Sequence, residues 1–227
     1  MVRILPINIL PLFGARQGTA ITKYSTAGIH LGACFVFLEL KLYIRYMSIL
    51  VDSKLYEKKH SILFNSYSGT ETRVLSNLYP CEIWYINMKF NSSEQLYFWL
   101  MLDGFHIARE ELMNARNPKE AKKIGGKVLQ GLGWSKDSEY WQKRSVEALR
   151  TAIGLKMECC REFRDFVLRS GDMKIVEYAW WGDSLFGCVD VDMKNKGDWH
   201  VGAVQGGNVC GRLIMEWRKK WRTRLAG

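Results

Sequence analysis

Apolar side chains in the second half of the chain recur at helical spacing. Over residues 138–159 they return every three or four positions, which predicts one long amphipathic helix. Shorter runs with the same period predict helices over residues 161–169 and 211–222. The apolar positions of the long helix are Val146, Leu149, Ile153 and Met157, and those of the last helix are Leu213, Ile214, Trp217 and Trp221.

Two further helices are predicted from their capping sequences. A serine pair at residues 92–93 precedes a helix expected over residues 94–102, and serine is a favoured N-cap. At the second start Asn117 is the cap, a proline takes the first helical position, and a glutamate stands three residues after the cap. A glycine pair at residues 125–126 interrupts the apolar stripe of this second helix, so another element is expected to pack closely there.

Aromatic and β-branched residues gather before the helices. They predict strands within residues 61–67 and 82–90, separated by an extended segment that contains Pro80. Since the strands come first and the helices follow, the chain is expected to adopt an α+β fold that is mostly α-helical, with a few short N-terminal strands. Residues 61–227 are expected to form a single compact domain.

Composition separates the first 46 residues from the rest. Apolar residues make up 48% of the 227 residues and charged residues 25%, as in globular proteins. Residues 1–46 hold five basic residues and one acidic residue, which is +4 of the formal net charge of +10. We expect this extension to lie outside the domain, with Met47 as the natural start, although a basic, acid-poor start also fits an organelle transit peptide. The run without full charges at residues 27–38 is too short to cross a bilayer, so no membrane association is expected.

Cysteine and histidine usage argues against a metal site. The six cysteines form no C-x-x-C pair, and the four histidines are scattered. We therefore expect free thiols in a reducing compartment, a cytoplasmic location and no metal. The basic charge favours an anionic partner such as nucleic acid, a phosphorylated small molecule or a membrane surface, although a basic solvated surface would give the same count.

Three segments carry groups that could take part in catalysis or binding. Glu94 follows the serine pair at a helix start, where a carboxylate can transfer a proton, orient water or simply cap the helix. Asp183 stands in an aromatic, glycine-rich stretch at residues 180–187, which fits either a platform for a flat base or a tight turn. Glycines within residues 206–211 precede the last helix and could leave backbone N–H groups free for a phosphate.

Taken together, the motifs of the chain resemble those of the NADAR (YbiA-like) family in order and approximate spacing. The motifs are Leu75-Ser76-Asn77-Leu78, Ser92-Ser93-Glu94-Gln95, Pro118-x-x-Ala121-Lys122-x-x-Gly125, Trp141 with Lys156-Met157, Trp181-Gly182-Asp183 with Phe186-Gly187, and Asn208-x-x-Gly211-x-Leu213 with the residues up to Arg218. The resemblance covers roughly 160 residues, and an ordered set of this kind seldom arises by chance.

The resemblance implies hydrolysis of an N-glycosidic bond to ribose without a cofactor. Members of the family remove the base from ribosylamino-pyrimidine phosphate intermediates of riboflavin synthesis, or remove ADP-ribose from modified guanine in nucleic acid. The partner is therefore expected to be a small phosphorylated ribosyl-base substrate or ADP-ribosylated nucleic acid, and the basic C-terminal helix would suit the second. The transition state should carry oxocarbenium character, which a carboxylate can stabilise while another activates water.

Carried over to this sequence, the resemblance assigns catalysis to Glu94 and Asp183, and either residue can take either role. The expected substrate-binding residues are Ser76, Asn77, Trp141, Trp181, Phe186, Asn208 and Gly211.

Three departures from the family pattern bear on activity. Met101 stands where a lysine is usual, seven residues after the glutamate, and Phe186 replaces a usual tryptophan. Residues 188–205 resemble an insertion between two motifs. The missing amine leaves two hypotheses: a working enzyme in which another basic side chain, such as Lys89 or Arg212, has taken over, or a binding module for nucleotides or nucleic acid with weakened turnover.

Overall fold

The computed structural model describes residues 53–69, 71–135 and 138–227. The predictions for residues 1–46 and for Met47 lie outside the described residues. In chain order, the elements are β1 (Lys54–Glu57), β2 (Ser61–Phe64), β3 (Ile83–Tyr85), β4 (Met88–Phe90), α2 (Ser93–Met101), α3 (His106–Met113), α4 (Pro118–Gly131), α5 (Glu139–Cys159), α6 (Arg161–Arg169), β5 (Lys174–Glu177), β6 (Val189–Asp190), β7 (Ala203–Gly206) and α7 (Val209–Ala226).

Side chains cap the starts of the predicted helices. At α2, Oγ of Ser92 accepts a hydrogen bond from the backbone N–H of Gln95 at 3.2 Å. At α4, Oδ1 of Asn117 accepts from the N–H of Glu120 at 3.0 Å, and Pro118 takes the first helical position. The predicted helices α2, α4, α5, α6 and α7 are confirmed, with ends that differ by a few residues at most. Helix α3 is an addition, and no side chain caps its start.

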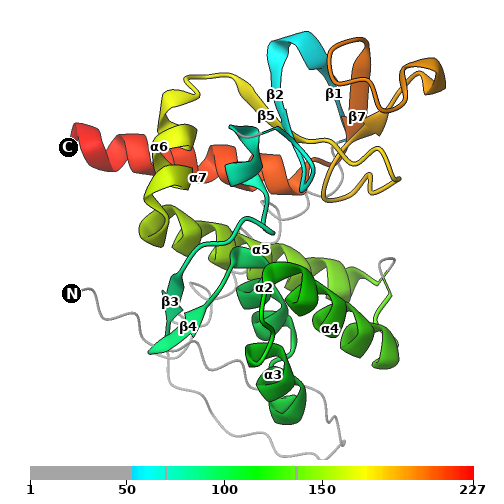
Figure 1. Cartoon of the computed structure of the whole chain (residues 1–227). Helices are drawn as coiled ribbons and strands as arrows, with labels where there is room; N and C mark the ends of the chain where they lie inside the picture. Colours follow the sequence, from blue (N-terminus) through cyan, green and yellow to red (C-terminus); the bar gives the residue numbers. More distant parts are fainter. Residues whose placement is uncertain (1–52, 70, 136–137) are drawn as a thin grey trace, which may run out of the picture. The chain divides into compact units, whose positions relative to one another are not determined.

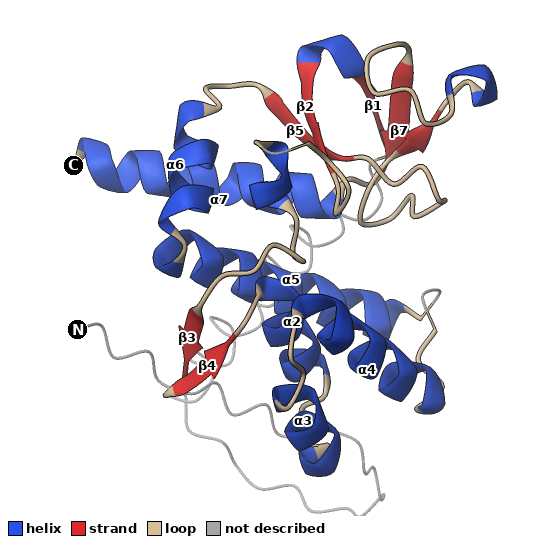
Figure 2. Cartoon of the chain, viewed as in Figure 1, coloured by secondary structure: helices blue, strands red, loops and turns tan. Residues whose placement is uncertain are grey.

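Short strands from distant parts of the chain pair in three small sheets (Figure 1). The first has the order β1-β7-β6 and is antiparallel, while β2 pairs in parallel with β5 although α2 to α6 lie between them in the sequence. Strands β5, β6 and β7 follow helices, so strands are not limited to the N-terminal part. Helices still predominate in the described residues (Figure 2), and the predicted α+β class is confirmed.

The segment predicted as one strand within residues 82–90 is a hairpin. Strands β3 and β4 pair with Ile83 opposite Phe90, and the turn between them holds Ile86 and Asn87 at φ values of 48° and 60°. Asparagine adopts this left-handed conformation readily, whereas a β-branched residue rarely does. The sequence therefore resembles one continuous strand at the point where the chain turns.

Helix α5 ties the helices to the C-terminal part of the domain, because it contacts both α2 and α7. Gly154 of α5 admits the ring of Trp217 from α7, since a Cβ at this position would lie 2.3 Å from its Cζ2 atom. Gly125 of α4 admits Phe98 of α2 in the same way, with 2.2 Å to Cγ. The close packing predicted at the glycine pair is thus confirmed at Gly125, and it brings α4 against α2. Among the helices of the described ranges, none is long and apolar enough to cross a membrane.

Candidate active site

Glu94 lies on the first turn of α2 but does not cap this helix. Its neighbour Gln95 takes that task, because its N–H donates to Ser92 and its Oε1 accepts from the N–H of Asn91 at 2.7 Å. The side chain of Glu94 is 12% exposed, and its Oε1 lies 3.5 Å from Nζ of Lys122 on α4. The capping role considered for Glu94 therefore belongs to Gln95, and the Glu94 carboxylate faces a cation instead.

Lys122 lies within the field of three carboxylates. Attraction to Glu94 raises the pKa of Lys122 most, and Glu177 and Asp183 raise it further. Glu177 is the last residue of β5, and Asp183 lies in the loop that follows. We call Glu94, Lys122, Glu177 and Asp183 the charged cluster. The structure thus brings together the two residues predicted to be catalytic, Glu94 and Asp183, and adds Glu177 and Lys122 to them.

Glu177 is a carboxyl group with a strongly altered proton affinity. Its partial burial at the end of β5, followed by the negative charges of Asp183 and Glu94, raises the pKa of Glu177 to about 7, against the opposing effect of Lys122. A group with this pKa can give or take a proton near neutral pH. Sequence analysis missed Glu177 because no recognised motif includes it. The available signal was a single acid at the end of an apolar run, six residues before Asp183.

Asp183 anchors the loop that carries it. Its Oδ1 accepts hydrogen bonds from the N–H groups of Leu185 at 3.2 Å and Phe186 at 3.1 Å. This is the geometry of a tight turn fixed by an aspartate side chain. The tight turn considered for this stretch is therefore present. The same carboxylate also raises the pKa of Lys122 and of Glu177, while its catalytic role stays a prediction.

The predicted aromatic residues occupy two places. Trp141 of α5 is buried and meets Phe186 edge to face, with ring centroids 5.9 Å apart and an interplanar angle of 77°. Such a pair forms an apolar wall rather than two parallel plates around a flat base. Trp181 is 48% exposed and stands at 80° to Trp180, which leaves much of its surface accessible near Asp183.

Asn77 links α2 to the charged cluster. Its Oδ1 accepts a hydrogen bond from Oγ of Ser93 at 3.0 Å, and its Nδ2 donates to Sγ of Cys210 at 3.6 Å. The Cys210 thiol in turn donates to the carboxyl group of Glu177. Asn77 therefore reaches the cluster through the thiol of Cys210.

Ser76 has a supporting position next to Asn77. Its carbonyl oxygen accepts a hydrogen bond from the buried ammonium of Lys156 at 2.6 Å, and its Oγ accepts from the N–H of Leu78 at 3.2 Å. Burial lowers the pKa of Lys156. These contacts hold the segment that presents Asn77, while substrate binding by Ser76 stays a prediction.

The backbone N–H groups at the start of α7 are not available to a phosphate. Those of Gly207, Asn208, Val209 and Cys210 donate to carbonyl oxygens of residues 184–187, at distances between 2.7 and 3.3 Å. The predicted phosphate site at this helix start is therefore wrong, because the loop that carries Asp183 already fills it.

Asn208 and Gly211 join α7 to β5. Asn208 is buried at a φ of 45°; its Oδ1 accepts from the N–H of Glu177 at 3.0 Å, and its Nδ2 donates to the carbonyl oxygen of Ile175 at 2.9 Å. A Cβ on Gly211 would lie 2.2 Å from the same carbonyl oxygen. Both contacts hold the end of β5 in place, so these two residues position Glu177.

Met101 lies two turns after Glu94 and is fully buried. It belongs to an apolar cluster that also contains Leu102 and Leu112. An ammonium at this position would have to be buried among apolar groups. The amine that contacts Glu94 in this chain is that of Lys122 on the neighbouring helix.

The two side chains considered as substitutes for the missing lysine lie elsewhere. Lys89 pairs with Glu82 at 2.5 Å on the β3–β4 hairpin. Arg212 lies on the first turn of α7, where its charge acts on the thiol of Cys188. Neither of them is the cation that lies beside Glu94. That cation is Lys122, which stands in the motif of residues 118–125 but was not predicted to have a role in the site.

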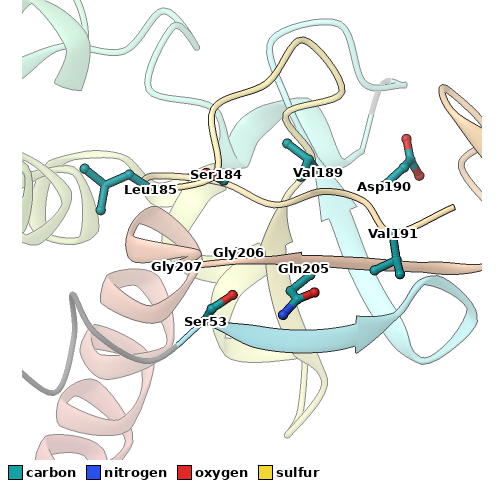
Figure 3. Close-up of a pocket in the computed structure, with 9 residues that line it drawn as sticks. All are labelled: Ser53, Ser184, Leu185, Val189, Asp190, Val191, Gln205, Gly206 and Gly207. Carbon is teal, nitrogen blue, oxygen red and sulfur yellow. The ribbon is translucent and has the colours of Figure 1, made fainter. Parts of the chain in front are cut away.

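A cavity of about 420 Å³ adjoins the loop that carries Asp183 (Figure 3). One acidic residue, Asp190, lines this cavity. Its carboxylate pairs with the ammonium of Lys58 at 2.5 Å and accepts a hydrogen bond from the hydroxyl of Tyr178 at 2.6 Å, so its charge is already compensated. Residues 188–205, which were expected to be an insertion, contribute to its wall through β6 and β7. The lining residues are Ser53, Ser184, Leu185, Val189, Asp190, Val191, Gln205, Gly206 and Gly207. No member of the charged cluster is among them, so the cavity and the cluster are separate features.

Within residues 53–69, 71–135 and 138–227, no group of three or more His, Cys, Asp or Glu side chains is placed to hold a metal ion. The cysteines in this part of the chain are free thiols: Cys81, Cys159, Cys160, Cys188 and Cys210.

Comparisons with known proteins give a family match and a structural likeness. The family model of the NADAR domain matches residues 59–222. Among solved structures, the NMR structure of the E. coli protein YbiA is similar at 20% sequence identity and a TM-score of 0.54, covering 74% of this chain and 89% of that one. This likeness shows a shared fold. The search of curated proteins gave no match.

Proposed function

The chain belongs to the NADAR family, and from this premise we propose that it is an N-glycosidase that hydrolyses the C–N bond between a base and ribose. Its candidate substrates are ribosylamino-pyrimidine phosphates and ADP-ribosylated guanine in nucleic acid. The observation that carries the proposal is the charged cluster, in which the carboxylate of Glu94 lies 3.5 Å from the ammonium of Lys122, while the charges of Glu177 and Asp183 also raise the pKa of this lysine.

Cleavage of this bond needs a proton for the departing base and a carboxylate for the ribose. Glu177 fits the first task, because a carboxyl group with a pKa of about 7 is partly protonated at neutral pH. Glu94, held 3.5 Å from the ammonium of Lys122, fits the second as a carboxylate that stabilises the oxocarbenium-like centre or directs water to it. Asp183 shares this second task, and its hydrogen-bonded loop keeps the carboxylate in a fixed orientation.

The alternative of a binding module without turnover depended on Met101. This side chain is buried in the apolar cluster of α2, whereas the ammonium of Lys122 is the one in contact with Glu94. An amine is therefore present at the carboxylates despite the methionine. This contact favours the enzyme over the binding module.

Single-turnover cleavage of both candidate substrates tests the proposal. With protein in excess over substrate, the native chain should release either free pyrimidine base and ribose phosphate from the first substrate, or free ADP-ribose from the second, whose guanine remains in the nucleic acid. If neither substrate is cleaved while ligand binding remains measurable, the chain is a binding module and the proposal is wrong.

A further inference from the structure

One strongly basic segment of the domain consists of α4 and the residues just before it. Residues 116–131 contain five basic residues and one acidic residue, a net charge of +4. Residues 47–227 together have a net charge of +6. Helix α7 is a second basic segment, because residues 209–226 contain six basic residues and one acidic residue, a net charge of +5.

Lys119, Lys123 and Lys127 are exposed, and their spacing places them in one row along α4. The row spans about 12 Å at a helical rise of 1.5 Å per residue. Among the described residues, their ammonium groups form no ion pair and no hydrogen bond. Glu120, the one acidic residue of this helix, forms its ion pair with Arg116 instead. Arg116 lowers the pKa of Glu120 most, and the charge of Lys123 lowers it further without a direct contact.

The basic residues of α7 differ in this respect. Arg218 donates to Oγ of Ser170 at 2.7 Å, and its guanidinium is buried. Arg222 pairs with Asp172 at 2.7 Å, Arg224 pairs with Glu158 at 2.7 Å, and Lys220 pairs with Glu216 at 2.9 Å. Four of the basic side chains of the C-terminal helix, which was expected to suit nucleic acid, are thus engaged in contacts within the domain.

The row begins beside the charged cluster. Lys122, which contacts Glu94, lies between Lys119 and Lys123 in the sequence and on the edge of the same exposed face. Gly126, with open space around its backbone, also lies on this face, while Ala121, Gly125 and Leu129 bury the opposite face.

An aromatic pair lies just beyond the other end of the row. The backbone N–H of Trp134 donates to the carbonyl oxygen of Leu129 in α4, so this indole follows the helix directly. The ring of Tyr140 stacks on it with centroids 5.5 Å apart, and Tyr140 is 63% exposed. A basic row that ends at an exposed aromatic ring is the combination that single-stranded nucleic acid favours, because phosphates meet the charges and a base can stack on the ring.

We propose that the row formed by Lys119, Lys123 and Lys127 binds the phosphates of a single nucleic-acid strand whose target base enters the charged cluster. This inference rests on the proposed function, and it selects the nucleic-acid substrate over the small metabolite. A single phosphate group cannot contact a row of this length, whereas successive phosphodiesters can. A base inside a duplex would have to leave the stack to reach partly buried carboxylates, so a single strand is the simpler substrate.

Binding of an unmodified strand tests the row without any turnover. The probe is a short, fluorescein-labelled single-stranded oligonucleotide, and its anisotropy gives Kd at several salt concentrations between about 50 and 200 mM. The triple variant Lys119→Gln, Lys123→Gln, Lys127→Gln should bind at least about tenfold more weakly, with a log–log salt slope smaller by about 2, since each lost contact removes about 0.7. The matched control, Lys194→Gln, Lys196→Gln, Lys219→Gln, removes the same charge from other exposed sites and should bind like the native chain.

The outcomes separate this inference from the proposed function. Equal weakening of oligonucleotide binding in both triple variants, or no binding by the native chain, would contradict the inference that the row binds nucleic acid. So would binding to vesicles of anionic phospholipid in the absence of binding to the oligonucleotide. If the row variant still releases base from the free ribosylamino-pyrimidine phosphate at the native rate, the proposed glycosidase activity is supported, whether or not the row binds nucleic acid. If the row binds the strand but neither substrate is cleaved, the inference about the row is supported and the proposed glycosidase activity is wrong.

Discussion

At the scale of single residues, Glu94 and Gln95 divide two tasks between neighbouring positions of one helical turn. Gln95 caps α2, whereas Glu94 faces Lys122. Glu94→Gln should therefore keep the fold and lower single-turnover base release by at least about a hundredfold, the scale of a positioned acid–base group. Glu139→Gln is the matched control, because Glu139 is also a first-turn glutamate but lies exposed on α5. Native-like turnover in the folded Glu94 variant would remove Glu94 from the mechanism.

Glu177 should give the reaction its dependence on pH. If its protonated form is the acid that serves the departing base, base release should fall as the pH rises through about 7, the pKa of Glu177. Glu177→Gln should be slow at every pH and should lack this limb of the profile. A native profile that is flat between pH 5 and 8.5 would argue against this role.

The same pKa sets the sign of a stability effect. In the unfolded chain Glu177 should titrate near the ordinary value of 4.5, so between pH 4.5 and 7 the folded protein binds the extra proton. Folded stability is therefore full below pH 4.5 with respect to this group and declines as the pH rises to 7. The Tm of Glu177→Gln should equal the native value near pH 4.5 and exceed it at pH 8 by roughly 10 °C, which corresponds to about 3 kcal/mol.

Met101 should tolerate a lysine poorly. The side chain is fully buried among apolar neighbours, so Met101→Lys would place an ammonium where no described acid contacts it. We expect a loss of roughly 3 kcal/mol, or about 10 °C in Tm, without a gain in base release. Met193→Lys, at a position that is 69% exposed, should leave Tm within error. Faster base release by Met101→Lys would show that the pocket can still accommodate the family's usual lysine.

The sequence predicts those parts of the candidate site that stand in motifs. Glu94, Asp183 and Asn77 each lie in a recognisable run, and the structure brings all three to one region. Glu177 and Lys122 could not be assigned this way, because their properties depend on partners from other elements. Asn208 is the opposite case. Its motif is recognisable in the sequence, but only the fold reveals that its side chain forms hydrogen bonds with the backbone of β5.

At the scale of elements, the contact between α7 and β5 should be intolerant of any side chain at Gly211. A Cβ there would meet the carbonyl oxygen of Ile175 at 2.2 Å and Oδ1 of Asn208 at 2.5 Å. Gly211→Ala should lower Tm by about 5 °C or more, since backbone must move to admit the methyl group. Gly126→Ala in α4 meets nothing within 4 Å and should raise Tm slightly, because alanine favours helices. A Tm for Gly211→Ala at or above the native value would contradict the close contact.

Helices were predictable to the degree that their signals are local. The cap, proline and glutamate at the start of α4 lie within four residues, and the apolar period of α5 repeats over its length. The strands carry no such local signal. Strands β5, β6 and β7 have two to four residues each and form only when partners far away in the sequence pair with them. The β3–β4 hairpin was misread because Ile86 occupies a turn conformation that isoleucine rarely adopts.

At the scale of the whole molecule, the domain should begin between Met47 and Lys54. The described pairing begins with β1, whose Lys54 lies opposite Gly206 at the end of β7, and β7 leads directly into α7. A chain that starts at Met47 keeps every described element, so its Tm should stay within about 2 °C of the full chain. A chain that starts at Lys58 loses β1, which leaves β7 without one of its two partner strands. It also loses Tyr56 from the apolar cluster that Tyr56 shares with Tyr178, so the buried ring of Tyr178 becomes exposed. This second truncation should lower Tm by roughly 10 °C or give insoluble protein. The two truncations are measured side by side by thermal unfolding. If the chain from Met47 is itself unfolded or insoluble, residues 1–46 belong to the domain, and the boundary drawn from their composition is wrong.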